Sequence, residues 1–510
     1  MAIVEELEAS AGGRRRLGLK NPADLQPAGA IEVMTAADVN EAVARARLAQ
    51  KDWGSLAVRE RARYLRRAAR ILAAKRSEYV DVIRRETGKT ELECLFMELF
   101  AVCDSLTWYA KHAPRVLRER RRRMHLLSPM KKLRLLRRPL GVVGIITPWN
   151  GPFVLAANPV VQALVAGNAV LLKPSEVAPY SGKLVGDLFA EAGLPEDLLI
   201  VLTGDGETGS ALVNADVDRI CFTGSVATGR KVGETCGRRL IPCTLELGGK
   251  DPMIVCADAN LERAARGAVF GSCLNAGQIC MAVERVYVAE PVYEAFVERV
   301  VELVGELRQG GDDSDIGPII WPRQLETIER HIADAVDGGA TVRVGGKRAP
   351  GLAGLYFEPT VITEVNHDMA IMREETFGPI VAVMRVRDEK EAVRLANDSS
   401  YGLSSSVWTR DLDNGVEISR RIEAGSACVN DSEVVYGVTE APFGGLKQSG
   451  VGQVNSESGL LGYCHTMPVV IDRFGRDRER MWYPFDAAKQ RGMHKAISLL
   501  WNTPLGRWMA

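Results

Sequence analysis

The sequence predicts an α/β protein whose parallel sheets are covered by helices. From about residue 140 onward, short runs rich in β-branched residues, such as GVVGII and AVLLK, alternate with helical patterns such as YSGKLVGDLFAEAG. A second series of the same kind begins near Pro252 with PMIVCAD and continues to about residue 445. Because such alternation is typical of parallel sheets with crossover helices, two α/β domains are the simplest expectation.

Composition and charge narrow the class of protein. The 510 residues contain 65 Lys and Arg and 65 Asp and Glu, so the formal net charge is zero. A nucleic-acid partner is therefore not expected, and a small neutral or acidic ligand is favoured. The ten cysteines form no CxxC pair, and the N-terminal MAIVEELEAS has no apolar core of signal-peptide length. We expect a cytoplasmic protein without disulfides or a metal site.

One long uncharged stretch, 139–172, has two interpretations. It follows Arg137 and Arg138, as a transmembrane helix with a positive inner flank would. Pro148, Pro152 and Pro159 and four glycines would interrupt a lipid-exposed helix several times. We therefore predict a strand at 141–146, a short buried helix, and a second strand at 169–172.

Residues 55–118 read as helical, and a basic run follows at 115–138. This run includes four consecutive arginines, 120–123, and its alternating Leu and charged residues predict a hairpin. A solvated arm or subunit contact is the simpler interpretation, and a patch for anionic lipid is the alternative.

The C-terminal segment, from about residue 473 to residue 510, combines aromatic and basic side chains. It could wrap a neighbouring subunit or lie in a membrane interface, which would make the protein membrane-peripheral. The residues concerned are Trp482, Tyr483, Phe485, Lys489, Arg491, Lys495, Trp501, Arg507 and Trp508.

Three residues could carry chemistry. Cys280 lies in NAGQICMAVERVYV, where Gly277 permits a tight turn before a strand, although an isolated cysteine is as often a buried hydrophobe. Glu246 in TLELGGKDP could act as a general base if burial raises its pKa, and is otherwise a solvated strand end. Asn150 in ITPWNGP could donate to a developing oxyanion, although turns favour Asn anyway.

Several glycine-rich segments could bind a cofactor. Residues 204–209, GDGETG, match GxGxxG literally, but no acidic residue stands about 20 positions later to hold a ribose. In FTGSVATG, Gly224, Ser225 and Gly229 open a helix whose N-terminus could hold a phosphate. Lys173 and Glu176 in KPSE follow another strand and could reach ribose hydroxyls.

Together these segments closely resemble the aldehyde dehydrogenase superfamily, in the family's order and spacing over roughly residues 30 to 470. The matching segments are TPWN (147–150), KPSE (173–176), FTGS with Gly229, LELGGK (245–250), NAGQIC (275–280), EETFGP (374–379) and PFGG (442–445). The resemblance implies a Rossmann-type NAD-binding domain (1–120 and 140–248), an α/β catalytic domain (249–462) and a small β oligomerisation arm (121–139 and 463–475). Residues 476–510 are then an extension.

The resemblance also implies a role for each matching residue. Cys280 is similar to the family's nucleophile, Glu246 to its general base, and Asn150 to its oxyanion donor, with the Cys280 backbone N–H as second donor. The residues implied to bind NAD, with NADP as the alternative, are Thr147, Trp149, Lys173, Ser175, Glu176, Gly206, Gly224, Ser225, Gly229, Leu247, Glu375 and Phe377. Glu176 can accept both ribose hydroxyls but would repel a 2′-phosphate, which favours NAD.

The implied activity is oxidation of an aldehyde to the free acid, since Glu246 can activate water against a cysteine thioester. Release of acyl coenzyme A is one alternative, and a catalytically silent scaffold on the same fold is another. A homodimer or homotetramer is expected.

The substrate stays open at this stage. Succinic semialdehyde is suggested by the similarity of CMAVERVYV and the C-terminal extension to an actinobacterial branch of the family. However, Gln453, Val454 and Asn455 replace a stretch in which some such enzymes place an Arg. The apolar flanks Ile279 and Met281 would suit a fatty or aromatic aldehyde instead.

Overall fold

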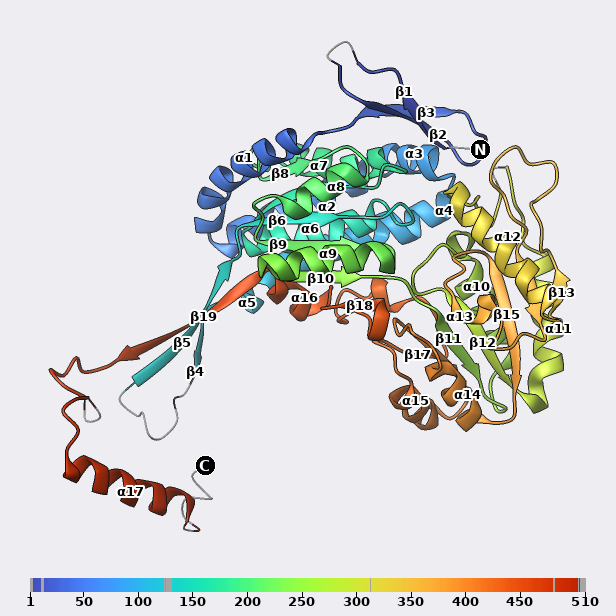
Figure 1. The fold of residues 1–510 in the computed structure, drawn as a ribbon. Helices are drawn as coiled ribbons and strands as arrows, with labels where there is room; N and C mark the ends of the chain where they lie inside the picture. Colours follow the sequence, from blue (N-terminus) through green and yellow to red (C-terminus); the bar gives the residue numbers. More distant parts are fainter. Residues whose placement is uncertain are drawn as a thin grey trace. The chain divides into compact units, whose positions relative to one another are not determined.

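The computed structural model describes residues 3–10, 13–122, 124, 131–311, 313–479, 482–502 and 504. The chain divides into two compact units (Figure 1). We call Met1–Val116 with Pro139–Cys464 the body, and Leu117–Arg138 with His465–Ala510 the arm unit. Each is described by itself.

The body begins with an antiparallel meander and a helical segment. The meander consists of β1 (Val4–Leu7), β2 (Arg16–Lys20) and β3 (Pro27–Glu32). The helical prediction for 55–118 is confirmed, since buried Ala62, Leu65, Ala68 and Leu72 share one face of the second helix. The helices are α1 (Ala36–Ser55), α2 (Val58–Ala74), α3 (Arg76–Thr87), α4 (Glu91–Glu93), a π-helix (Cys94–Phe100) and α5 (Ala101–Val116).

The first large sheet has the strand order β18-β10-β9-β6-β7-β8. Five strands are parallel, and the direction of strand succession reverses between β6 and β9, where ligands of such sheets bind. The strands are β6 (Val142–Ile146), β7 (Ala169–Lys173), β8 (Leu199–Val201), β9 (Arg219–Thr223), β10 (Cys243–Glu246) and antiparallel β18 (Gly450–Val451). The associated helices are α6 (Val154–Ala166), α7 (Pro179–Glu191), α8 (Gly206–Asn214) and α9 (Val226–Arg239).

The uncharged stretch 139–172 is strand, helix and strand, as predicted. Every residue of α6 is buried, which explains why this helix has no polar face. Among the described residues, no helix is both long and apolar enough to cross a membrane.

The second large sheet has the order β13-β14-β15-β12-β11-β16-β17, parallel except between β13 and β14. Its strands are β11 (Asp251–Val255), β12 (Val283–Ala289), β13 (Thr341–Val344), β14 (Thr360–Thr363), β15 (Ile380–Val386), β16 (Ser406–Trp408) and β17 (Cys428–Val429). The accompanying helices are α10 (Leu261–Cys273), α11 (Tyr293–Gly305), α12 (Pro322–Asp337), α13 (Ala370–Arg373), α14 (Glu389–Asn397) and α15 (Leu412–Arg421). The two predicted α/β series are therefore both present.

The predicted division of the body into an NAD-binding and a catalytic domain stays a proposal. Strand pairing crosses its second boundary, because β18 lies in 249–462 but pairs with β10 of the first sheet. The following helix, α16 (Ser456–Gly462), contacts α5 and α6. The chain after β17 thus returns to the first sheet.

The arm unit contains a three-stranded sheet in the order β19-β5-β4 and one helix. The predicted hairpin is confirmed, since β4 (Arg120–Arg122) pairs antiparallel with β5 (Lys131–Pro139). The third strand is β19 (Cys464–Asp472), and α17 (Ala487–Trp501) follows. Arg123, Arg507 and Trp508, which the sequence singled out, lie outside the described residues.

The core of the second sheet generates a stability prediction. Phe296 on α11 is fully buried in this core, so Phe296→Ala should destabilise the protein by about 3 to 5 kcal/mol. Denaturant unfolding followed by Trp fluorescence measures the shift. Leu48→Ala on α1, where Leu48 is 67% exposed, is the control and should cost no more than about 0.5 kcal/mol. Equal midpoints for the two variants would contradict this packing.

Candidate active site

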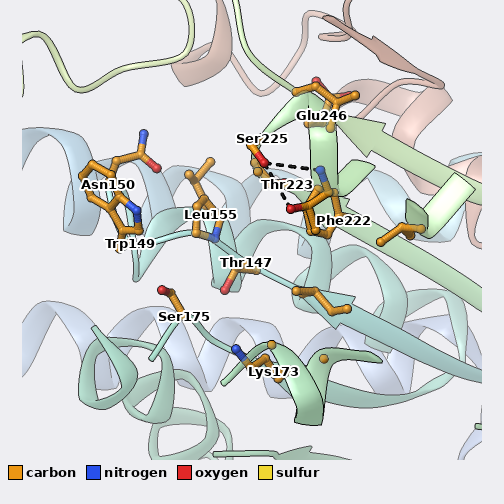
Figure 2. Close-up of a pocket in the computed structure, with 18 of the residues that line it drawn as sticks. Thr147, Trp149, Asn150, Leu155, Lys173, Ser175, Phe222, Thr223, Ser225 and Glu246 are labelled. Atoms are coloured by element: carbon orange, nitrogen blue, oxygen red, sulfur yellow. Dashed lines mark hydrogen bonds between the residues drawn. The ribbon is translucent and has the colours of Figure 1, made fainter. Parts of the chain in front are cut away.

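A cavity of about 650 Å³ lies at the carboxyl ends of the parallel strands of the first sheet, as the strand order predicts. It brings together fourteen of the fifteen residues that the sequence singled out, and Gly229 is the exception. Figure 2 shows lining residues of this cavity, and those that it labels come from β7, β9, β10, α6 and the segments after β6, β7 and β9. The fourteen are Cys280, Glu246, Asn150, Thr147, Trp149, Lys173, Ser175, Glu176, Gly206, Gly224, Ser225, Leu247, Glu375 and Phe377.

Cys280 lies just after an unusual turn, the 3-10 segment Leu274–Gly277. Asn275, Ala276 and Gly277 all have positive φ, at 53°, 54° and 70°. A Cβ at Gly277 would stand 2.1 Å from the Gly378 carbonyl oxygen, so only glycine fits there. The turn therefore holds the thiol at a junction between elements, as the sequence suggested.

Asn150 is fixed to the same turn. Its side-chain amide donates to the Gln278 carbonyl at 3.0 Å, and the Asn275 amide donates back to the Asn150 carbonyl at 3.0 Å. Because an amide NH₂ carries two hydrogens, one remains for a ligand oxygen. Asn150 thus has the geometry that an oxyanion donor needs.

A buried ion pair holds the backbone carbonyl of Asn150. Lys89 Nζ donates to the Asn150 carbonyl at 2.7 Å and lies 2.9 Å from a Glu98 carboxylate oxygen. The other Glu98 oxygen accepts the backbone N–H groups of Phe153 and Val154 at the start of α6. Both charged side chains are at most 1% exposed, so each requires the other. This pair anchors the loop after β6.

The environment of Cys280 disfavours the thiolate. Burial raises the pKa of its thiol well above the ordinary range, and nearby carboxylates raise it further. These carboxylates belong to Glu375, Asp251, Glu246 and Glu433, in order of decreasing effect. The thiol is therefore protonated at rest, and its activation requires a proton acceptor.

Glu246, the last residue of β10, lines the cavity but is itself buried. Both carboxyl oxygens are inaccessible and accept no hydrogen bond from the described residues. Burial alone raises the pKa of Glu246 well above its ordinary range. A raised pKa makes the ionised carboxylate a stronger proton acceptor than an exposed one, as a general base requires.

The segment EETFGP is held by a second buried ion pair, between Lys250 and Glu284. Glu284 also accepts the backbone N–H groups of Thr376 and Phe377, at 2.8 and 2.9 Å. Phe377, at φ 54°, stands edge-on to Trp149 with ring centroids 5.6 Å apart. An aromatic wall is thereby fixed beside the cavity.

Glu375 faces the same space from this segment. Its carboxyl accepts the Gly249 N–H at 3.0 Å, while burial and the charge of Glu284 raise its pKa to about 8. A Cβ at Gly248 would stand 2.5 Å from Glu375 Oε2, so the glycine permits this close approach.

The opposite end of the cavity offers partners for a ribose. Lys173, at the end of β7, lies 3.1 Å from the Glu176 carboxylate, which is 32% exposed and accessible to hydroxyl groups. Thr147 Oγ1 is buried in the wall without a hydrogen-bond partner in the described chain. A ligand hydroxyl or phosphate oxygen would satisfy it, so these residues fit a nucleotide cofactor.

The start of α9 matches the predicted phosphate site in part. Ser225 is the N-cap of α9, and its hydroxyl accepts the Thr228 N–H at 3.4 Å and lies 3.1 Å from the Thr228 hydroxyl (Figure 2). Gly229 lies inside the helix and not at the cavity. Its added Cβ would stand 2.4 Å from Leu247 Cδ2, so this glycine serves helix packing.

An apolar cluster adjoins Cys280, away from the nucleotide groups. Cys280, Met97, Leu274, Val435 and Tyr436 pack against its buried members. The buried members are Ile279, Met281, Ala282, Leu403, Phe443 and Val454. This cluster gives one side of Cys280 an apolar surrounding.

Sequence reasoning missed several residues of the site. Trp321 and Gln324 line the cavity, and Trp321 stands 6.2 Å from Trp149 between ring centroids. Lys89 and Glu98 support Asn150 from more than 50 residues earlier in the chain. No matching segment contains any of these four. Buried charges within the helical region 55–118 were the one available signal, since such charges need partners.

Comparison with known proteins agrees with this geometry. The model of the aldehyde dehydrogenase family matches residues 9–469, nearly the whole chain. The protein therefore belongs to the aldehyde dehydrogenase family, and it is an aldehyde-oxidising oxidoreductase that uses NAD or NADP.

Individual relatives differ in their named substrates. A 4,4'-diapolycopene aldehyde oxidase of Methylomonas is 38% identical over 92% of this chain and 88% of its own length. A protein of Mycolicibacterium smegmatis, provisionally named succinate-semialdehyde dehydrogenase (NADP(+)), is 39% identical over 87% and 86%. A Mycobacterium tuberculosis aldehyde dehydrogenase solved with NAD+ superposes with a TM-score of 0.87 at 35% identity, over 90% of this chain and 95% of that one.

The turn before Cys280 generates a prediction. Gly277→Ala should displace the thiol and lower kcat about 100-fold, because misplacing a reacting group by about 1 Å has effects of this size. NADH formation with any accepted aldehyde measures it. Gly305→Ala at the end of α11, where an added Cβ meets nothing within 4 Å, should keep wild-type kcat. A Gly277→Ala enzyme with wild-type kcat would show that the turn does not position the nucleophile.

Proposed function

We propose that the protein oxidises an aldehyde to the free carboxylic acid through a thioester on Cys280, which water activated by Glu246 hydrolyses. The observation that carries this proposal is that the thiol and a buried, unpartnered carboxyl line one cavity with the nucleotide-binding candidates. Nucleophile, base and cofactor groups thus share a single space.

In the first step the Cys280 sulfur adds to the aldehyde carbon. The free N–H of the Asn150 amide holds the developing oxyanion, together with the Cys280 backbone N–H that the family resemblance implies. Each such donor contributes about 3 to 4 kcal/mol in comparable sites. Because burial raises the pKa of the Cys280 thiol, we propose that its proton passes to a water in the cavity as the sulfur–carbon bond forms.

The NAD(P) site is proposed at Lys173, Ser175 and Glu176 for the adenosine ribose, with Trp149 and Ser225 near the pyrophosphate. Glu375 and Phe377 are proposed to hold the nicotinamide ribose and ring. When bound, the nicotinamide supplies the hydride acceptor. Glu176 favours NAD, because its carboxylate would repel a 2′-phosphate.

Hydrolysis then depends on Glu246. Its raised pKa means that it can accept a proton from a water placed against the thioester carbon. Two alternatives are therefore disfavoured. Acyl transfer to coenzyme A does not need a base that activates water, and a silent scaffold needs neither Cys280 nor Glu246.

Succinic semialdehyde is our first candidate substrate, and it rests on the names of relatives such as the M. smegmatis protein. An apolar aldehyde, fatty or aromatic, is the second. The observation that favours it is the apolar cluster that packs against Cys280. We further propose that the arm unit's sheet mediates a homodimer or homotetramer.

The hydrolysis step generates a prediction. In Glu246→Gln, NADH should form in a burst of about one equivalent per site and turnover should fall about 10² to 10⁴-fold, because acylation proceeds without deacylation. Mass spectrometry should detect the acyl group on Cys280, and Cys280→Ala should give no burst. Since hydrolysis needs the ionised form of Glu246 and burial raises the pKa of this carboxyl, deacylation should accelerate with rising pH above the ordinary carboxyl range, in wild type only. Steady wild-type turnover by Glu246→Gln would remove Glu246 as the base.

The substrate proposal is tested by kcat/KM for succinic semialdehyde, hexanal, decanal and benzaldehyde, with NAD and NADP in parallel. If the apolar cluster beside Cys280 lines the substrate site, kcat/KM should be at least about tenfold higher for the uncharged aldehydes, since burying an unpaired carboxylate is costly. A preference for succinic semialdehyde would instead support the first candidate, and would require an Arg or Lys from outside the cluster.

A further inference from the structure

The arm unit differs sharply in charge from the rest of the chain. Residues 117–138 and 465–510 together contain 18 Lys and Arg but only five Asp and Glu, a net charge of +13 in a chain whose total is zero. Arg120, Arg121 and Arg122 stand in sequence on β4. A concentration of one sign this strong favours an anionic partner.

The helix α17 of the arm unit has apolar side chains exposed on one side. No residue of α17 is buried. Met493, Ile497 and Trp501 follow one another at four-residue intervals, which places them on one side, and they are 41%, 50% and 54% exposed. Arg491 and Lys495 lie on the opposite side. Lys489 begins the same row as the apolar residues, but its ammonium group donates to the Trp482 and Pro484 carbonyls, so the exposed apolar face is formed by the three apolar residues.

The approach to α17 adds exposed aromatic side chains. Trp482, Tyr483 and Phe485 are 57%, 77% and 65% exposed. The helix itself contains no Asp or Glu, and the adjoining Asp486 is occupied as its N-cap, accepting the Lys489 N–H at 2.8 Å. Trp and Tyr beside basic residues are typical of the membrane–water interface.

We propose that the arm unit binds an anionic lipid surface, with α17 lying in the plane of the interface. Met493, Ile497 and Trp501 enter the apolar boundary, while Arg491, Lys495 and the arginines of β4 face lipid phosphates. Two weak signals, apolar insertion and charge attraction, together give peripheral attachment. No described helix could span the membrane, so attachment is at the surface.

A second copy of the chain is the competing occupant of this face. Lys is depleted at the cores of protein interfaces, and two copies of the basic α17 segment would repel one another, whereas the proposed oligomer contact lies on the sheet of the arm unit. An anionic lipid surface complements both the positive charge and the exposed apolar face. A contact between two copies of α17 would instead be detected as a change in oligomeric mass.

The test is cosedimentation of the full-length protein with vesicles of phosphatidylcholine alone or mixed with phosphatidylglycerol. Binding should be at least about tenfold tighter to the anionic vesicles and should weaken at high salt. Ile497→Glu and the pair Arg491→Gln with Lys495→Gln should each reduce binding about tenfold. Equal binding to both vesicle types, or none to either, overturns the proposal.

Matched variants on the body keep the test specific. Leu48→Glu on α1 and Arg420→Gln with Arg421→Gln on α15 change exposed residues of the same kinds and should bind as wild type. NADH formation with a soluble aldehyde checks that each variant is folded. If Ile497→Glu instead lowers the oligomeric mass in light scattering and leaves vesicle binding unchanged, α17 is a subunit contact and the proposal fails.

Discussion

The hydrogen bond from the Asn150 amide to the Gln278 carbonyl joins the loop after β6 to the turn before Cys280. One partner comes from the first sheet and the other from the approach to the second. Together with the bond from the Asn275 amide to the Asn150 carbonyl, this bond orients the remaining N–H of Asn150 toward the side of the Cys280 turn. The left-handed turn at 275–277 and the Lys89–Glu98 pair are best understood as the supports of this one connection.

The site contains several buried charged side chains, and burying each of them costs free energy. Lys89 with Glu98 and Lys250 with Glu284 are ion pairs almost without solvent contact, and each also fixes backbone next to a reacting group. Replacing such pairs by apolar residues is often neutral or stabilising in other proteins, so stability alone does not explain them. Here they position loops, while the unpartnered carboxyl of Glu246 gains the raised pKa that a base requires.

The body and the arm unit carry their apolar surfaces in different settings. The body places an apolar wall beside Cys280, whereas the arm unit carries the chain's excess positive charge and an exposed apolar helix face. A lipophilic aldehyde would partition into the same interface that the arm unit is proposed to bind. Substrate class and attachment are nevertheless separate properties, because they rest on different residues.

The sequence by itself determined the α/β class, the helical region 55–118 and the arm hairpin, because short-range patterns encode strand ends and turns. Its resemblance to a known family pointed to Cys280, Glu246 and Glu176, which the patterns alone left open. Tertiary structure alone brought Lys89, Glu98, Trp321 and Gln324 to the site, since their partners lie far along the chain. It also moved Gly229 from ligand contact to packing against Leu247, and returned β18 to the first sheet. The physical reason is that burial, pairing and close approach are properties of neighbours in space, which local spacing does not specify.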